Sequence, residues 1–179
     1  PICLLREKFM HARRNPEEGL LGAFSKDAKG STKIKVNDSK GSAALARAIP
    51  IGLLFAGDSK AAFDEAVRAA ALSHSNPVGY YAAGGLAAMI SCLAYGLTLP
   101  KALERAETLL GKVHKTDPIL SLLGAAEEQA NNHPAGKSGT WDHIDSIVSL
   151  GSGENAEEAL AIAVYCILAE DDPRRERMG

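Results

Sequence analysis

Aromatic residues are scarce in this chain, and their scarcity restricts the fold classes that fit it. Only 5% of the 179 residues are aromatic although 46% are hydrophobic, so alanine and leucine supply most of the apolar content. These two residues favour helices, as do the glutamate, lysine and arginine that accompany them. The length suits one domain with a sizeable core. The composition therefore predicts an all-α fold and argues against a β-sandwich.

Cysteines are also few, and none of them forms a CxxC pair. The three are Cys3, Cys92 and Cys166, an odd number. Cys92 and Cys166 each lie in an apolar stretch with helical spacing, where a free thiol behaves as a small core hydrophobe. This usage does not suggest a disulfide framework. It favours a reducing, cytoplasmic location.

An excess of one charge and a long apolar run are both missing. Twenty basic and 22 acidic side chains give a formal net charge of −2, which predicts neither nucleic acid nor an anionic membrane as a partner. No run of about 18 uninterrupted apolar residues occurs, so we predict no membrane span. The arginines at 174, 175 and 177 are mixed with acidic residues, a pattern typical of a solvated tail.

The familiar catalytic and cofactor motifs are absent as well. The sequence contains no GxSxG, Walker or dinucleotide-binding pattern, and its histidines lack the HxxxH or HxH spacing of a zinc site. Glu157 and Glu158 are adjacent, so at most one of them faces the interior. The acids at 170–172 lie near the C-terminus. We therefore expect solvated carboxylates at these positions, and no metal site.

What the sequence does contain is a series of helix start signals. Asp58-Ser59 and Asn76-Pro77 each pair a capping side chain with a good first helical residue. The helix that follows Pro77 is apolar on all sides, so we expect it to be buried, and its Gly84-Gly85 pair predicts a close approach of another helix. Pro50 predicts a kinked helix or two short helices within 41–57. Further helices are expected from about 59, 100, 117, 141 and 154.

The predicted organisation is an N-terminal segment and loop (1–36), a helical domain (37–170) and a charged tail (171–179).

Three polar segments are candidates for ligand binding. His74 lies between two helices, just before a helix N-terminus, where free backbone N–H groups suit a phosphate or a ribose hydroxyl. The alternative is a histidine that only caps or packs. The loop containing Ser39, Gly41 and Ser42 precedes an apolar helix and is suited to hold an anion through backbone amides, although a plain flexible loop also fits. Gly151, Ser152 and Gly153 form either a similar turn or a simple helix stop.

The order of these segments resembles the ADP-ribosylglycohydrolase family, all-helical hydrolases related to dinitrogenase reductase-activating glycohydrolase and to J1 crystallins. The resemblance rests on residues 39–42 (SKGS), 46–53 (ARAIPIGL), 72–77 (LSHSNP) and 151–163 (GSGENAEEALAIA). It covers roughly 37–169, the central portion of the chain, and implies the family's multi-helix orthogonal bundle. It places Ser39, Gly41 and Ser42 on the loop around a diphosphate, His74 near the ligand, and the residues from Gly151 to Gly153 along the adenosine.

The resemblance also implies two magnesium ions, whose ligands are not found in this chain. In the family, a Thr-Asp-Asp-Thr-like motif and a Gly-Asp-x-Asp motif hold the metals, which orient the water that cleaves the ADP-ribosyl bond. No Asp-Asp pair precedes residue 171, and residues 171–172 lack the flanking threonine. We therefore predict no catalytic residues in this chain, and we expect the isolated chain to be inactive.

Three functional hypotheses follow. The first is a fragment of a magnesium-dependent hydrolase that removes ADP-ribosyl groups from proteins or small molecules. The second is a non-catalytic protein that binds ADP-ribose or another nucleotide, or serves structurally as crystallins do. The third is an unrelated helical domain whose alanine-rich composition matches by chance. If terminal helices of a larger bundle are missing, exposed apolar faces of the helix from 77 to 97 predict self-association.

Overall fold

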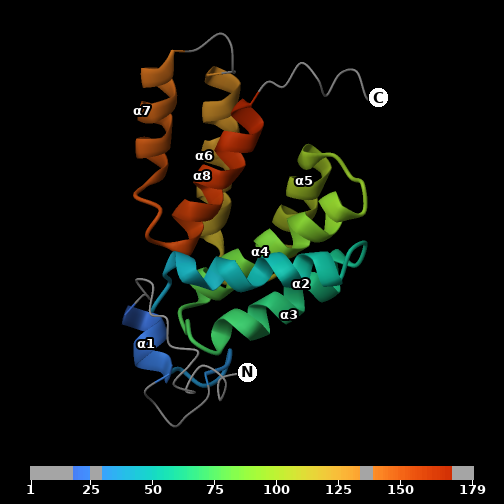
Figure 1. The fold of residues 1–179 in the computed structure, drawn as a ribbon, viewed down its shortest axis with the longest axis vertical. Helices are drawn as coiled ribbons and strands as arrows, with labels where there is room; N and C mark the ends of the chain where they lie inside the picture. Colours follow the sequence, from blue (N-terminus) through green and yellow to red (C-terminus); the bar gives the residue numbers. More distant parts are fainter. Residues whose placement is uncertain (1–17, 25–29, 134–138, 171–179) are drawn as a thin grey trace, which may run out of the picture.

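The computed structural model describes residues 18–24, 30–133 and 139–170, and its regular elements within these ranges are helices joined by loops (Figure 1). Its elements are α1 (Glu18–Phe24), the 3-10 helix η3 (Ser42–Arg47), α2 (Ala48–Leu54), α3 (Ser59–Ala71), α4 (Pro77–Ala94), α5 (Leu99–Leu110), α6 (Asp117–Asn132), α7 (Thr140–Leu150) and α8 (Ala156–Ala169). Within the described ranges no strand occurs beyond a single β-bridge. The all-α prediction is confirmed. The predicted tail at 171–179 lies outside the described residues.

The helices form two groups that cross at a large angle. Helices α2, α3 and α4 lie together in one group, and α6, α7 and α8 stand side by side across it (Figure 1). Helix α4 packs against α2, α3, α5 and α8, and therefore joins the two groups. This arrangement agrees with the multi-helix orthogonal bundle that the resemblance implies. It also brings the N-terminal ends of α4 and α8 to the same side of the molecule as the loop before η3.

The predicted helix starts are confirmed in atomic detail. The Asn76 side chain caps α4 by accepting a hydrogen bond of 3.0 Å from the Val78 N–H, and proline follows at the first helical position. Asp58 caps α3 in the same way through the Ala61 N–H. Pro50 lies in the first turn of α2, directly after η3, where its missing N–H leaves no helical hydrogen bond unmade. The segment 41–57 therefore forms two short helices.

Helix α4 is the core helix that its composition predicts. By length and apolar content it could cross a membrane, but 61% of that window is buried inside the fold. An added Cβ at Gly84 would lie 2.7 Å from Cγ2 of Val67 in α3, and one at Gly85 would lie 3.2 Å from Cδ1 of Leu110 in α5. The glycine pair thus allows α3 and α5 to approach α4 closely, as expected.

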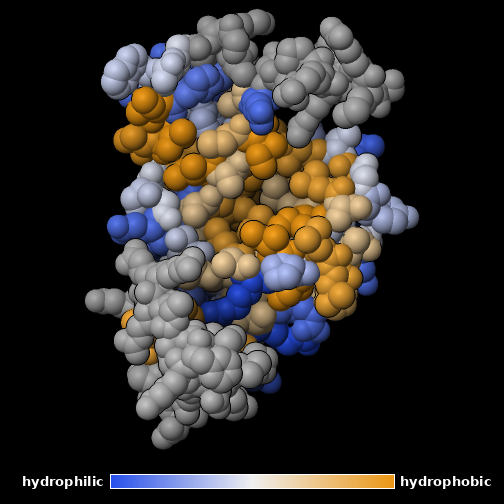
Figure 2. Space-filling model, in the orientation of Figure 1, coloured by the Kyte–Doolittle hydropathy of each residue, from blue (hydrophilic) through white to orange (hydrophobic). Residues whose placement is uncertain are grey.

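The exposed apolar side chains lie only partly where the sequence predicted, since Leu93 and Tyr95, within 77–97, are exposed. Cys92 is buried as expected. Cys166, also expected in the core, is exposed together with its neighbour Ile167, because both lie on the side of α8 that no described helix covers. The most exposed large side chains of α2 and α7 are Leu54 (77%) and Trp141 (77%). Figure 2, drawn in the orientation of Figure 1, shows apolar patches around a hollow on the face toward the viewer. Most of α4 is covered, apart from side chains near its C-terminal end such as Leu93, and self-association stays a prediction.

Candidate functional site

Asn37 brings the loop before η3 together with the junction between α3 and α4. Its amide nitrogen donates hydrogen bonds to the carbonyl oxygens of Gly19 (2.9 Å) and Ser73 (2.7 Å). Its amide oxygen accepts from the N–H groups of Ser39 (3.2 Å) and Ser75 (3.1 Å). One side chain therefore joins α1, the predicted anion loop and the predicted histidine segment. All four of its hydrogen-bonding positions are used.

The same loop is paired with the segment before α8. Gly41 and Asn155 form an antiparallel β-bridge, in which the Ser42 N–H donates to the Glu154 carbonyl (2.8 Å) and the Ala156 N–H donates to the Lys40 carbonyl (2.8 Å). Residues more than 100 positions apart in the sequence are thereby fixed side by side. The structure thus brings all three predicted ligand segments to one region.

The turn from Gly151 to Gly153 has a defined geometry. Gly151 and Gly153 have φ angles of 121° and 78°, values that favour glycine. The Glu158 carboxylate accepts hydrogen bonds from the Ser152 hydroxyl (3.0 Å), the Gly153 N–H (3.1 Å) and the Asn155 side chain (2.8 Å). These bonds, with the one from Asn155 foremost, hold the pKa of Glu158 below its usual range. The turn is therefore an ordered structure built around one carboxylate.

We expect Glu158→Gln to destabilise the protein by about 1 kcal/mol at neutral pH, a value reduced for partial exposure. A lowered pKa stabilises the fold at pH values above the unfolded pKa, and this contribution is lost as the pH falls through the folded pKa. The difference between wild type and variant should therefore shrink in acid. Urea unfolding at neutral and acidic pH measures it. Glu128→Gln, at an exposed position of α6, is the control, and a difference independent of pH would contradict the prediction.

His74 lies at the centre of this region but is completely buried. Its Nδ1 is hydrogen-bonded with the Ser73 hydroxyl (2.9 Å), which also accepts from the Arg47 guanidinium (2.6 Å). A ligand reaches the imidazole only if the residues around it move. The structure thus gives His74 a packing role at the junction, and direct ligand contact by His74 stays a prediction. Ser39, Gly41 and Ser42 are partly exposed.

Two charged residues that the sequence did not assign to the site fix the loop to α8. The Lys40 ammonium pairs with Glu157 Oε1, and the Glu157 side chain is only 4% exposed, whereas that of Lys40 is 40% exposed. The prediction that Glu157 is solvated is wrong, because its position in the first turn of α8 faces the loop. Its other oxygen, Oε2, has no hydrogen-bond donor within the described part of the chain. Gly79 lets α4 approach here, since an added Cβ would lie 2.9 Å from the Lys40 Cα.

A metal centre is not formed by the side chains that the structure describes. Within residues 18–24, 30–133 and 139–170, no three His, Cys, Asp or Glu side chains lie together in a way that could hold a metal ion. Glu157 and Glu158 are committed to Lys40 and to the Gly151–Gly153 turn respectively. The described residues therefore do not fit a two-magnesium site. They do form a polar, glycine-containing surface.

Comparison with known proteins places this arrangement in a family. The family model for ADP-ribosylglycohydrolase matches residues 5–176, which extends on both sides of the 37–169 on which the resemblance rests. No curated protein and no solved structure matches the chain. The match covers nearly the whole sequence, and the all-helical architecture agrees with it. The chain therefore belongs to the ADP-ribosylglycohydrolase family of hydrolases.

Proposed function

We propose that this chain binds the ADP-ribosyl group of a modified protein or small molecule where residues 39–42 meet residues 151–155. The observation that carries the proposal is the β-bridge between Gly41 and Asn155, which joins two segments of the family-like series. The substrate class follows from the family, whose members hydrolyse ADP-ribosyl bonds. Glycine at 41, 151 and 153 keeps side chains off this surface, so that an ADP-ribosyl group can lie close to the backbone. The Ser42 hydroxyl suits a sugar oxygen.

The hydrolytic step itself is not assigned to any described residue. Members of the family are generally metal-dependent, and magnesium is the metal we propose for it. The described carboxylates do not converge on one point, so no mechanistic step through a metal is derived from them. What the described residues contribute is binding and orientation of the ADP-ribosyl group.

Binding is tested by calorimetric titration with ADP-ribose. We expect saturable binding that weakens at least about tenfold in Ser152→Trp, because the indole would cover the turn at an exposed position where it need not disturb packing. Ser121→Trp on α6 is the matched control, also exposed and remote from the loop. Wild-type protein that fails to bind ADP-ribose, or equal affinity in the two variants, would refute the site.

Release of the ADP-ribosyl group is a separate experiment. The isolated 179-residue chain, with magnesium added, is expected to leave an ADP-ribosylated protein intact, because hydrolysis requires carboxylates that the described residues do not bring together. Chromatographic detection of free ADP-ribose provides the measurement. Magnesium-dependent release that disappears with a chelator would show that the chain carries a complete catalytic centre.

A second candidate function is a non-catalytic nucleotide-binding or crystallin-like structural role. The dispersed carboxylates favour it. It is distinguished from the first by the two experiments together: binding without release leaves it open, and a protein that neither binds nor releases ADP-ribose has a structural role only.

For location we propose the cytoplasm, supported by the free thiols of Cys92 and Cys166.

A further inference from the structure

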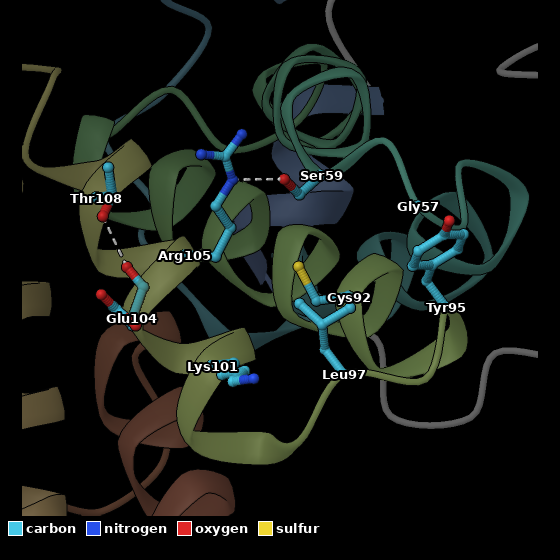
Figure 3. Close-up of a pocket in the computed structure, with 9 residues that line it drawn as sticks. All are labelled: Gly57, Ser59, Cys92, Tyr95, Leu97, Lys101, Glu104, Arg105 and Thr108. Atoms are coloured by element: carbon cyan, nitrogen blue, oxygen red, sulfur yellow. Dashed lines mark hydrogen bonds between the residues drawn. The ribbon is translucent and has the colours of Figure 1, made fainter.

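A cavity lies at the opposite end of α4 from the candidate ADP-ribose site. It has a volume of about 500 Å³, within the usual range of small-molecule sites. Its lining residues come from the turn before α3, the C-terminal end of α4 and one face of α5 (Figure 3). The candidate site lies at the N-terminus of α4, so nothing in the proposed function accounts for this cavity.

The walls of the cavity are held in place by packing and hydrogen bonds. The Gly57 N–H donates to the Ser91 carbonyl (3.2 Å), and the Ser91 hydroxyl donates to the Phe55 carbonyl (2.5 Å), which together fix the turn to α4. Gly57 has a φ of 87°, and an added Cβ there would lie 2.8 Å from the Tyr95 ring. The ring thus stands directly against the turn and forms one wall.

The opposite wall carries two cations. The Arg105 Nε donates to the Ser59 hydroxyl (2.9 Å), which orients the guanidinium and leaves its two terminal nitrogens to bind an anion bidentately (Figure 3). Lys101 lies one turn earlier on α5 and also lines the cavity. Among the described residues neither cation forms an ion pair, and the one acidic side chain in the lining is Glu104. The lining therefore has a surplus of one positive charge.

Between the cations and the tyrosine the surface is apolar. Cys92, whose sulfur points into the cavity, and Leu97 lie between the two walls (Figure 3). A cationic end and an apolar aromatic end together match a molecule that has an acidic group on a ring. We infer that the cavity binds a small aromatic acid, with its carboxylate or phosphate on Arg105, its ring between Tyr95 and Leu97, and Lys101 adding positive charge at the edge of the cavity.

Phenyl phosphate and benzoate are the probes, titrated by calorimetry or by amide shifts in NMR spectra. A ligand of this size in a partly open site should bind with a dissociation constant of about 1 mM, weakening as salt is added. Arg105→Gln should weaken binding about fivefold to tenfold, and Lys101→Gln should weaken it less, because its ammonium acts only through its charge. Lys112→Gln, an exposed lysine just beyond α5 and outside the lining, should leave it unchanged. Glu104→Gln should strengthen it, because the change removes the only negative charge of the lining.

A second measurement uses the wild-type protein alone. Bound phenyl phosphate should slow the alkylation of Cys92, which lines the cavity, and leave the exposed Cys166 on α8 unaffected, with both rates followed by peptide mass spectrometry. No saturable binding of either probe would overturn the inference. So would binding that Arg105→Gln leaves unchanged in a folded protein, or equal protection of the two cysteines. Loss of ADP-ribose binding has no bearing on these outcomes.

Discussion

Replacing Asn37 with aspartate is expected to destabilise the protein by about 3 kcal/mol at neutral pH. The amide nitrogen of Asn37 faces two carbonyl oxygens, those of Gly19 and Ser73. A carboxylate oxygen in its place loses two hydrogen bonds, each worth about 0.5–1.5 kcal/mol, and places negative charge against two acceptors. Urea unfolding followed by circular dichroism measures the change.

The Asn37→Asp substitution also has a signature in its pH dependence. The introduced carboxyl can donate a hydrogen bond only when protonated, so the fold should raise its pKa above the unfolded value. A raised acid pKa favours the fold below the unfolded pKa, and this advantage is lost as the pH rises through the folded pKa. The destabilisation should therefore be smaller in mild acid than at neutral pH. Asn131→Asp, at an exposed position near the end of α6, is the control and should cost about 0.5 kcal/mol. Equal losses in the two variants would show that Asn37 does not hold the three segments together.

Local signals in the sequence were enough to predict where the main helices begin and which of them is buried. Asn76-Pro77 and Asp58-Ser59 fix the starts of α4 and α3 because capping depends on a side chain and the backbone two or three residues away. Gly84 and Gly85 predicted a close helix approach for a similar reason, since a missing side chain in a buried helix needs a neighbour to fill the space. Such features depend on short stretches of chain and can be recognised without a structure.

The contacts that assemble the candidate site could not be predicted in this way. Asn37 and Lys40 lie in a polar loop, far in the sequence from their partners. Asn37 bonds to Ser73 and Ser75, which are 36 and 38 positions away, and Lys40 pairs with Glu157, which is 117 positions away. The family-like order of segments indicated which loops matter but not which side chains join them. Glu157 was misjudged because adjacent glutamates at a helix start usually face water, and only the tertiary position of α8 against the loop buries one of them.

Burial of the apolar residues of α8 was likewise only partly predictable. Leu160 and Val164 are buried, whereas Ile167 is 39% exposed. A helix that is apolar on all sides does not reveal from its own sequence which side faces the core. The same limit applies to the cavity at the C-terminal end of α4, whose walls come from three separate elements that no motif connects.

The ion pair of Lys40 with Glu157 should give a stability difference as large as that of Asn37→Asp, and its two partners should differ in their effects. Lys40→Met leaves a buried carboxylate without the charged partner that the described structure gives it. We expect a loss of about 3 kcal/mol, at the lower end for such pairs because Lys40 is 40% exposed. Glu157→Met leaves only a lysine that can turn into water, and removes an oxygen that has no donor in the described structure. Its effect should lie within about 1 kcal/mol of wild type.

The double substitution Lys40→Met/Glu157→Met decides between this explanation and simple loss of packing by the lysine stem. If the stranded charge causes the loss, the double variant should recover most of the stability that Lys40→Met alone removes, giving a coupling energy of about 2 kcal/mol. Lys60→Met supplies the matched control, because it breaks the exposed ion pair of Lys60 with Asp64 and should cost less than about 0.5 kcal/mol. Losses that simply add in the double variant would mean that Lys40 acts through its stem. The loop and α8 would then be held together by the β-bridge at Gly41 without help from the ion pair.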